Sequence, residues 1–560
     1  MGGVVRVASP LGDTTAHHED PSFCIKENLT LYYLPLKVKI EQFFDSALST
    51  CELLPELAGF CQHLQLAQQQ LEAPMRVAIV GIAKAGKSTF MNAVLGEYVV
   101  FTDEEEATFN VSKFTYAEQK SLLIHYKETG RAVEPKPFED LKQLTVRDKE
   151  RWDYLSSIKY VEVFYPNPIL KLFSLIDTPG LESAFGTDSD NTQEFMSTNQ
   201  QYLSIYGAEL AAATQLEAQR ADAVIYLFDR SLAQVDQDFL KKFSGEDLAT
   251  ISPLNAIGGL TQIDKLFFNI DKNESLMTIA KEVVEALPSI AQSLFYQIQP
   301  ISGFLAWGAQ SITDREWGIL AELAKIPQPK MNNLLFSYDS FIKPDKSVNV
   351  SIEDRKIIRE RLNIYGISLV YGSLIRGVSE RSEIVDLLLK ESGVADLIAV
   401  IKSHFGNRAH IVKLNTVFNQ LQDHAKKGRR ELDGEPERAL AQILSSLQKI
   451  TSQENSFKEL EVLHDYYDHK LADFSTEEAQ ELLCITGENG NSCAAKLSLP
   501  SDASTREMLL KAIAGMNKWR SKSQQSFGKN RIYLSAANVI HDSYQEIFMR
   551  LSQVQQLLDG

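Results

Sequence analysis

The sequence is poor in the features that mark secreted or membrane-spanning proteins. Its 560 residues include five cysteines and no Cys-x-x-Cys pair, so we expect reduced thiols in a reducing compartment. The N-terminus lacks the apolar core of a secretory signal, and no run approaches the roughly 18 apolar residues that span a bilayer. We therefore expect a cytoplasmic protein whose contact with membrane, where it occurs, is peripheral.

Positive charge is also scarce. The formal net charge of −17 argues against general nucleic-acid binding, which needs a cationic surface to displace counterions. The apolar fraction of 44% and the charged fraction of 23% are ordinary for a folded protein, and the length suggests about two to four domains. The composition therefore predicts an acidic, multidomain protein without a nucleic-acid partner.

The most informative segment runs from residue 76 to residue 96. An apolar, strand-like run ends at Gly81, the pattern Gly-x-x-x-x-Gly-Lys-Ser follows, and a helical run comes next. Gly81 and Gly86 allow backbone N–H groups to face phosphate oxygens, and the following helix adds the positive end of its dipole. We expect Lys87 to reach the β- and γ-phosphates and Ser88 to ligate Mg²⁺. The segment therefore predicts a site for a nucleoside triphosphate.

Two further elements are expected to complete the phosphate and metal site. After the helix, Thr108 is the candidate switch threonine and Thr102 the second choice, because a hydroxyl and a carbonyl there can close over Mg²⁺. An edge-strand threonine is the alternative. A strand expected over 170–176 ends in Asp-Thr-Pro-Gly. Asp177 is well placed for the Mg²⁺ shell, and the N–H of Gly180 for the γ-phosphate.

A base-reading motif is expected at the end of a later strand. The apolar run 254–260 leads into Thr261-Gln262-Ile263-Asp264, which has the form [NT]-K-x-D with glutamine in place of lysine. Asp264 can accept hydrogen bonds from N1–H and the 2-amino group of guanine, which adenine cannot supply, so GTP is favoured over ATP. A helix-capping aspartate is the alternative. Ser302, in Gln-Pro-Ile-Ser-Gly, is placed to cover the base from the far side.

Taken in order, the segments GIAKAGKST, DTPGLES, TQID and PISG resemble those of the dynamin-like large GTPases, particularly the bacterial branch. The resemblance covers about residues 76–303 and extends loosely to 391–397, which looks like the segment where such heads rejoin a helical stalk. It implies an α/β P-loop head with a mostly parallel sheet, an elongated all-α stalk, GTP or GDP as ligand, and Mg²⁺. The threonine after Gly-Lys-Ser recurs in this family, so Thr89 joins the expected nucleotide-binding set with the loop residue Ala85.

Two residues bear on how such a site would work. Gln262 removes the aliphatic packing that lysine gives over the base, so weaker affinity or slower turnover is expected. Lys84 lies inside the loop, where the bacterial branch often has a basic residue. Dynamin-like heads need positive charge near the bridging oxygen of GTP, so Lys84 is a candidate catalytic residue, acting in its own site or on a facing head. A solvent-facing loop lysine is the alternative.

The rest of the chain is helical in pattern. Apolar residues recur at helical spacing in segments 40–48, 440–447 and 540–558, and such stripes need burial against other helices. We expect the N-terminal helices to cover the apolar stripe of segment 540–558, which we call its seam. In chain order, we expect N-terminal helices that join the stalk (1–73), a GTPase core (74–310), a helical extension of the head that leads to the stalk (311–405) and the stalk itself (406–560).

Membrane contact is expected at the far end of the stalk. The non-periodic stretch 484–504 is the candidate tip, although it lacks the aromatic content of an inserting element. Two basic clusters, 426–430 and 518–522, are candidates for contact with anionic lipid, and Trp519 favours an interface in the second.

The sequence thus predicts a GTP hydrolase that associates through its heads, with itself or with a second dynamin-like protein, and moves a helical stalk against a membrane. Two alternatives stay open. One is a nucleotide-dependent assembly module with negligible turnover, and the other is a regulatory GTPase whose helices form a partner-binding arm. The acidic charge and the absence of a recognisable RNA-binding module both weigh against the regulatory GTPase.

Overall fold

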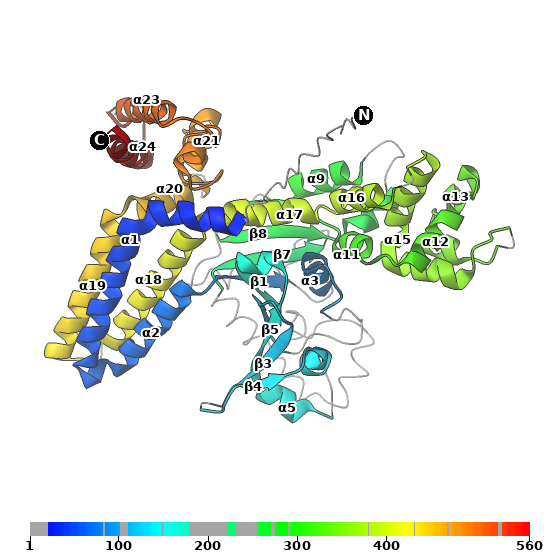
Figure 1. Cartoon of the computed structure of the whole chain (residues 1–560), viewed down its shortest axis with the longest axis horizontal. Helices are drawn as coiled ribbons and strands as arrows, with labels where there is room; N and C mark the ends of the chain where they lie inside the picture. Colours follow the sequence, from blue (N-terminus) through cyan, green and yellow to red (C-terminus); the bar gives the residue numbers. More distant parts are fainter. Residues whose placement is uncertain are drawn as a thin grey trace, which may run out of the picture.

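A computed structural model shows an α/β head from which helical units extend in different directions (Figure 1). The residues that the structure describes are 21–81, 85–100, 110–128, 130–146, 150–177, 221–229, 255–269, 275–288, 292, 294–345, 347–378, 380–429, 432–467, 470–524 and 529–559. Within these ranges, side chains are described everywhere except at 21–35, 152, 269 and 557–559.

The head is built on one sheet. Its described strands are β1 (Met75–Gly81), β2 (Ser112–Tyr116), β3 (Ser121–Tyr126), β4 (Glu134–Lys136), β5 (Ile158–Tyr165), β6 (Phe173–Asp177), β7 (Ala223–Asp229), β8 (Ala256–Thr261) and β9 (Ile298–Pro300). They lie in the order β4-β3-β5-β2-β6-β1-β7-β8-β9. β6, β1, β7, β8 and β9 pair in parallel, and β2 runs antiparallel to β6.

The parallel strands are almost entirely apolar because both faces of this part of the sheet are covered. Every residue of β6 and β8 is buried, and so is nearly every residue of β7. β5 instead alternates, as expected for a strand with one more open face. Because parallel strands end at the same edge, the carboxyl ends of β1, β6 and β8 bring Gly81, Asp177 and Thr261 to one side of the sheet.

A helical lobe extends from one side of the head. It comprises α12 (Asp314–Leu323), α13 (Gln328–Leu334), α14 (Tyr338–Ile342), α15 (Ile352–Ile375) and α16 (Arg381–Glu391). The lobe points away from the other helical units, whereas residues 311–405 were expected to lead to the stalk (Figure 1). Only α17 (Val394–Val400) and the π-helical turn η6 (Ile401–Gly406) continue toward the opposite side.

A four-helix arm extends from that opposite side. It consists of α1 (Pro21–Glu52), α2 (Ala58–Glu72), α18 (Asn407–Arg429) and α19 (Glu435–Gln453), although α2 and α18 are separated in sequence by the whole head. α1 contacts α2 and α19, and α18 contacts the same two helices. Phe43 of α1 packs edge-to-face on Phe418 of α18, with ring centroids 5.9 Å apart. The arm therefore joins both ends of the head to one bundle.

The C-terminal helices form a second unit, made of α20 (Asn455–Tyr467), α21 (Thr476–Ile485), α22 (Cys493–Lys496), α23 (Thr505–Gln524) and α24 (Arg531–Asp559). The seam of α24 packs mainly against α23 and α20. The prediction that the N-terminal helices cover this seam is therefore wrong. Ile540, Ile547 and Leu551 find apolar partners nearer in sequence, while Val554 stays 44% exposed.

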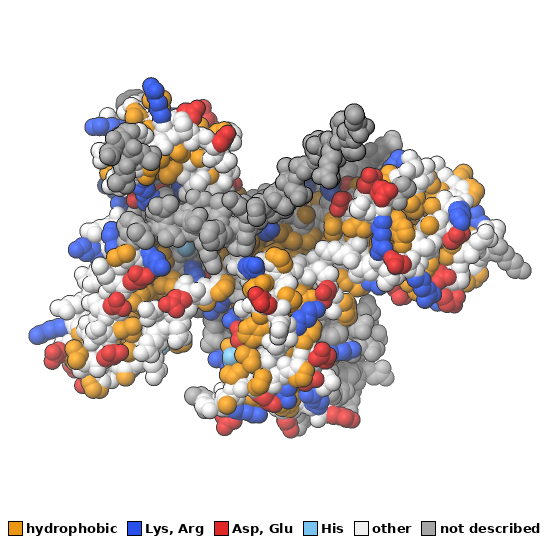
Figure 2. Space-filling model, viewed as in Figure 1, with side chains coloured by type: hydrophobic (Ala, Val, Ile, Leu, Met, Phe, Trp, Pro, Cys, Tyr) orange, Lys and Arg blue, Asp and Glu red, His pale blue; other side chains and the backbone are white. Residues whose placement is uncertain are grey.

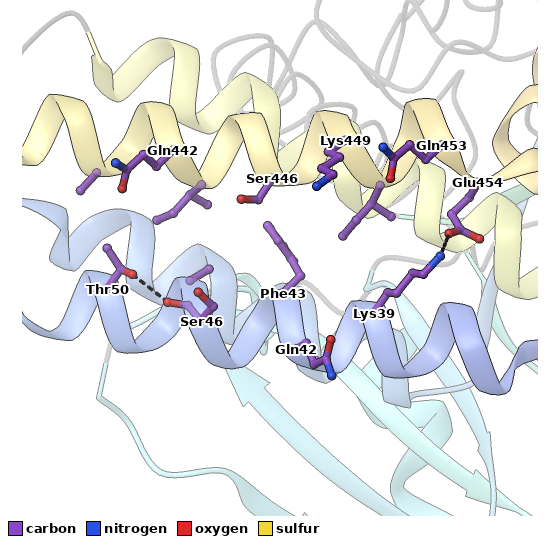
Figure 3. Close-up of a pocket in the computed structure, with 14 residues that line it drawn as sticks. Lys39, Gln42, Phe43, Ser46, Thr50, Gln442, Ser446, Lys449, Gln453 and Glu454 are labelled. Atoms are coloured by element: carbon purple, nitrogen blue, oxygen red, sulfur yellow. Dashed lines mark hydrogen bonds and ion pairs between the residues drawn. The ribbon is translucent and has the colours of Figure 1, made fainter.

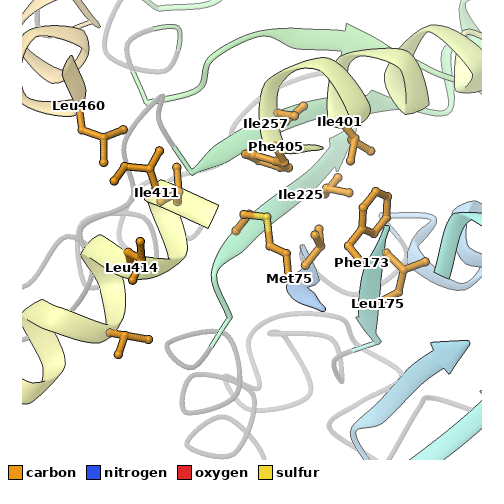
Figure 4. Packing of buried hydrophobic residues seen from close by; sticks show 14 of the residues in the cluster. Met75, Phe173, Leu175, Ile225, Ile257, Ile401, Phe405, Ile411, Leu414 and Leu460 are labelled. Carbon is orange, nitrogen blue, oxygen red and sulfur yellow. The ribbon is translucent and has the colours of Figure 1, made fainter. Parts of the chain in front are cut away.

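A continuous apolar core connects the sheet to the arm (Figure 4). Met75 and Ile225 of adjacent strands, Phe405 of the π-helical turn and Ile411 of α18 belong to the same buried cluster. Because a close-packed interior transmits displacement between neighbours, the head and the root of the arm are mechanically joined.

The stretch 484–504 does not form a distal tip. It lies beside the head, where the Tyr296 hydroxyl donates to Glu488 and the Asn407 amide donates to the Glu488 carbonyl at 3.0 Å. The buried guanidinium of Arg408 donates to the carbonyls of Leu483 and Thr486, each at 3.2 Å. These bonds add donors to carbonyls at the end of α21, and they fix the stretch at the junction between head and arm.

The second basic cluster is internal to the C-terminal unit. Trp519 is completely buried, and its Nε1–H donates to Glu481 at 2.7 Å. Lys518 pairs with Glu477 and Glu481. The expectation that Trp519 favours a membrane interface is therefore wrong, because Trp519 is buried and the adjacent Lys518 is neutralised by α21.

Glu478 offers a test of this packing. Burial alone would raise the pKa of Glu478, but hydrogen bonds from Lys522, the Ser475 N–H and the Tyr533 hydroxyl lower it to about 2. Since its folded-state pKa lies below the usual value of 4.5, its contribution is complete above pH 4.5 and is lost as the pH falls toward 2. We expect Glu478→Gln to lower the free energy of unfolding at pH 7 by roughly 2–3 kcal/mol. Urea unfolding should then show a smaller loss between pH 5 and pH 2.5 in the variant than in the parent, and equal losses would contradict this account.

Candidate nucleotide-binding site

The loop between β1 and α3 (Lys87–Leu95) has the geometry that its glycines predict. A Cβ on Gly81 would lie 2.2 Å from the Leu227 carbonyl oxygen, and Gly86 has a φ of +83°, which disfavours a side chain. Lys87 is buried, and its Nζ donates to the Gly81 carbonyl at 3.0 Å. The lysine is thus held beneath the loop, at the N-terminal end of a helix whose dipole favours an anion. Ala85 is buried in the same loop, and Ser88 and Thr89 are half-buried in the first turn of α3.

Asp177 ends β6 beside this loop. It aligns with Ile79 of β1, and its side chain is almost completely buried. Its Oδ1 has no hydrogen-bond partner among the residues that the structure describes. Burial raises the pKa of Asp177 to about 7, against the opposing effect of the Lys87 ammonium. A buried carboxylate oxygen without a donor next to a phosphate loop is the environment that a hard divalent cation suits, so the residues present fit Mg²⁺.

This fit predicts a specific effect of Asp177→Asn. In the parent, Mg²⁺ should strengthen GTP binding by at least about tenfold over the metal-free protein, an increment of about 1.4 kcal/mol. We expect the variant to lose most of that increment, because an amide is a weaker magnesium ligand than a carboxylate. Calorimetric titrations with and without EDTA would measure it. An undiminished magnesium increment in a variant whose thermal unfolding matches the parent would rule out Asp177 as a ligand.

The residues predicted to read the base lie at the same edge of the sheet. Thr261 ends β8, and its hydroxyl donates to the Phe228 carbonyl at 3.0 Å. Its Cβ is only 3.9 Å from where a Cβ on Gly86 would stand, so the two motifs adjoin. Gln262 follows with a φ of +56°. Asp264, in the short helix η5 (Ile263–Asn269), is 5% exposed, and Ser302 is completely buried.

Ser302 and Asp264 are directly bonded. The Ser302 hydroxyl donates to Asp264 Oδ1 at 2.7 Å and accepts from the Leu305 N–H, so it also caps α11 (Gly303–Ser311). The sequence prediction placed both residues near the base but did not predict this bond. This bond fixes one oxygen of the carboxylate that is predicted to read guanine.

A further contact to Asp264 could not be predicted from the sequence. The Asn363 amide Nδ2 donates to Asp264 Oδ2 at 2.6 Å. Asn363 interrupts α15 with a φ of +58° and a ψ of 173°, a conformation that costs a residue other than glycine about 1–3 kcal/mol. An asparagine within an otherwise helical run was the one available signal, and it is too common to identify a site.

The other predicted site residues are not placed. Lys84, Thr108, the second-choice Thr102 and Gly180 lie outside the described residues. Their roles as catalytic, switch or γ-phosphate-contacting residues stay predictions.

A separate groove of about 460 Å³ lies in the arm, between α1 and α19 (Figure 3). Phe43 projects into it, and Lys39 and Glu454 pair at one end. Its rim is formed mainly by uncharged polar side chains such as Gln42, Ser46 and Gln442. The groove shares no residue with the nucleotide motifs, so we do not assign it to the same site.

The chain is similar in sequence to proteins of the Dynamin family. The model of the Dynamin family matches residues 77–243. The isoniazid-induced protein IniC of Mycobacterium tuberculosis is 26% identical over 469 residues, which cover 83% of this chain and 88% of that protein. A bacterial dynamin-like protein of Nostoc punctiforme is 27% identical over 130 residues, 21% of this chain and 19% of that protein. A solved structure of an oligomerised bacterial dynamin pair is similar over 89% of this chain and 88% of its own, at 14% identity and a TM-score of 0.25.

The family match begins within β1 and therefore contains the phosphate-loop motif and Asp177. It confirms the resemblance recognised from the motifs: residues 77–243 of the head match the Dynamin family, and the dynamin-like relatives named for it are bacterial. The α/β head joined to all-helical units also confirms the predicted fold class.

Proposed function

We propose that the protein binds and hydrolyses GTP, and that association of its heads moves the helical arm against a membrane. The observation that carries this proposal is the meeting of two motifs at one edge of the sheet. Thr261, at the start of the base-reading motif, lies against Gly86 of the phosphate loop. This proximity supports the proposal that Lys87 and Asp264 recognise the two ends of one nucleotide.

The metal belongs to the same proposal. Ser88 and Asp177, with Thr108 as the candidate third residue, would hold Mg²⁺. When bound, Mg²⁺ neutralises charge on the phosphate oxygens. The chain's own contribution is to position the phosphates with the loop N–H groups and Lys87, and to select guanine with Asp264.

Contacts of the described residues support a link between this site and the arm. The Ser302 N–H donates to the Ser392 carbonyl at 2.8 Å, which ties the end of β9 to the junction of α16 and α17. Leu397 of α17 is completely buried in the core that reaches Phe405 and α18. On α18, Lys413 donates to the Ala73 carbonyl, where the chain passes from α2 into β1. Both chain crossings between head and arm are therefore fixed by buried contacts, as transmission of movement requires.

Membrane contact is proposed for the end of the arm far from the sheet (Figure 1). That end carries Leu53, which is 81% exposed, and the exposed side chains of Lys426 and Lys427. Each lysine near an anionic leaflet contributes about 1 kcal/mol. On the visible face of the described residues, basic and acidic side chains are interspersed, so attraction to lipid would be local (Figure 2). Among the described helices, none has the length and apolarity to cross a bilayer.

Steady-state GTP turnover with and without anionic vesicles tests this proposal. We expect the rate per head to rise with protein concentration, since heads must associate, and to rise further with vesicles. Lys426→Glu with Lys427→Glu should abolish the vesicle effect and keep the basal rate. Lys325→Glu with Lys356→Glu, on the lobe, is the matched control. GTP binding with no measurable turnover would favour the assembly module instead.

Lys84 is the proposed source of positive charge near the bridging oxygen of GTP. We expect Lys84→Ala to lower turnover by at least about tenfold while GTP affinity changes less than about twofold, the sign of an interaction made in the transition state. Turnover in the parent should depend little on potassium. Equal loss of affinity and turnover, or no loss of either, would make Lys84 a bystander.

A further inference from the structure

Both oxygens of the Asp264 carboxylate are held by internal donors. Ser302 Oγ donates to Oδ1 at 2.7 Å, and Asn363 Nδ2 donates to Oδ2 at 2.6 Å. An ionised carboxylate has about four lone-pair sites, so two stay available. Two is also the number that the N1–H and the 2-amino group of guanine require. The internal bonds are thus compatible with guanine recognition and restrict the plane of the carboxylate.

The backbone of Asn363 points to a role for its side chain. With a φ of +58° and a ψ of 173°, it breaks α15 into two helical segments. Its own Oδ1 accepts from the Ile364 N–H at 2.7 Å, so both ends of the amide are engaged. Strain of this kind persists only where the surrounding structure determines it, and it clusters at functional sites.

The break in α15 is packed tightly against α11. A Cβ on Gly308 of α11 would lie 2.1 Å from the Arg361 carbonyl oxygen, so the two helices touch through backbone at this point. Arg361 Nε donates to Glu316 at 2.8 Å, and its guanidinium lies 4.8 Å from the Trp307 ring centroid. Since Ser302 caps the same α11, both donors to Asp264 are fixed to one framework.

We propose that Asn363 is a positioning residue for base selection. With Ser302 it fixes the rotamer of Asp264, so that the remaining lone pairs face the N1–H and the 2-amino group of guanine before the nucleotide arrives. Preorganisation of this kind removes an ordering cost from binding. The inference rests on the proposed GTP site and adds to it a residue 99 positions from Asp264.

Asn363→Gly is the most direct variant, because glycine tolerates the positive φ and deletes only the amide. Affinities for GTP and ITP, whose base lacks the 2-amino group, would be measured by calorimetry in Mg²⁺. We expect the parent to prefer GTP and the variant to lose about tenfold of that preference, because ITP keeps only the N1–H contact and should lose much less affinity than GTP does. Thermal unfolding of the variant should stay close to that of the parent, because relief of the strained backbone offsets the two lost hydrogen bonds.

Arg361→Gln is the matched control, because it disturbs the same break without a bond to Asp264. It should keep the parental ratio of GTP to ITP affinity. A parental ratio in Asn363→Gly would overturn the inference, as would an equal loss for both nucleotides, which marks a purely structural role. Those results would leave the proposed function intact, whereas a parent that binds neither nucleotide would overturn both.

Discussion

Lys87→Ala should weaken GTP binding on the order of a hundredfold, about 2.8 kcal/mol, and in no case by less than about tenfold. The Lys87 ammonium is buried under the loop and bonded to the Gly81 carbonyl. No other cation among the described residues is bonded at this position. Its loss removes a buried cation from the phosphate oxygens and leaves the loop N–H groups, the helix dipole and Mg²⁺ to oppose more of their charge. Calorimetric titration with GTP in Mg²⁺ measures the effect.

Lys120→Ala is a suitable control for this variant. Lys120 follows β2, which runs antiparallel to β6, so it lies at the opposite edge of the sheet and pairs there with Glu97. Its removal should keep the parental affinity. If Lys87→Ala binds GTP as tightly as the parent does, the phosphate-loop assignment is lost.

Asp264→Asn should change which base the site prefers. The amide replaces one acceptor by a donor, which opposes guanine and suits the additional carbonyl oxygen of xanthine. We expect the ratio of GTP to XTP affinity to fall by at least about a hundredfold, because a site built on buried hydrogen bonds rejects a mismatched partner strongly. Competition binding with GTP, XTP and ATP measures the ratio.

The internal partners of Asp264 sharpen this prediction. Ser302 can accept as well as donate a hydrogen bond, so the new amide should orient its nitrogen toward that hydroxyl and its oxygen toward Asn363. The variant should therefore fold, and thermal unfolding checks it. A folded variant that retains the parental preference for GTP would show that Asp264 does not read the base.

Much of the candidate site was predictable from sequence because its motifs are local. Gly81 to Ser88 and Thr261 to Asp264 carry their chemistry within a few residues, and each follows an apolar run that the sheet requires to be buried. Because the strands that carry these motifs pair in parallel, their carboxyl ends meet at one edge of the sheet, and no other sequence signal is needed to predict this. Asn363 could not be predicted, because its bond to Asp264 depends on how α15 breaks and packs on α11.

The packing of the helical units could not be predicted from the sequence. Periodicity identified the stripes in α1, α19 and α24 but does not specify which stripe covers which. Phe43 packs on Phe418 of α18, whereas Ile547 packs within the C-terminal unit. The misplaced tip at 484–504 has the same origin: a stretch without periodicity looked like a free end. It is instead held at the junction by Arg408, which is distant in sequence. No sequence motif predicts the bonds of Arg408 to the end of α21.

The most direct test of the central claim is a calorimetric comparison of GTP and ATP binding to the full chain in Mg²⁺. If the phosphate loop and Asp264 form one guanine-nucleotide site, GTP should bind at a single site with an affinity at least about a hundredfold above that of ATP. Equal affinities for the two nucleotides, or no binding of either, would contradict the account.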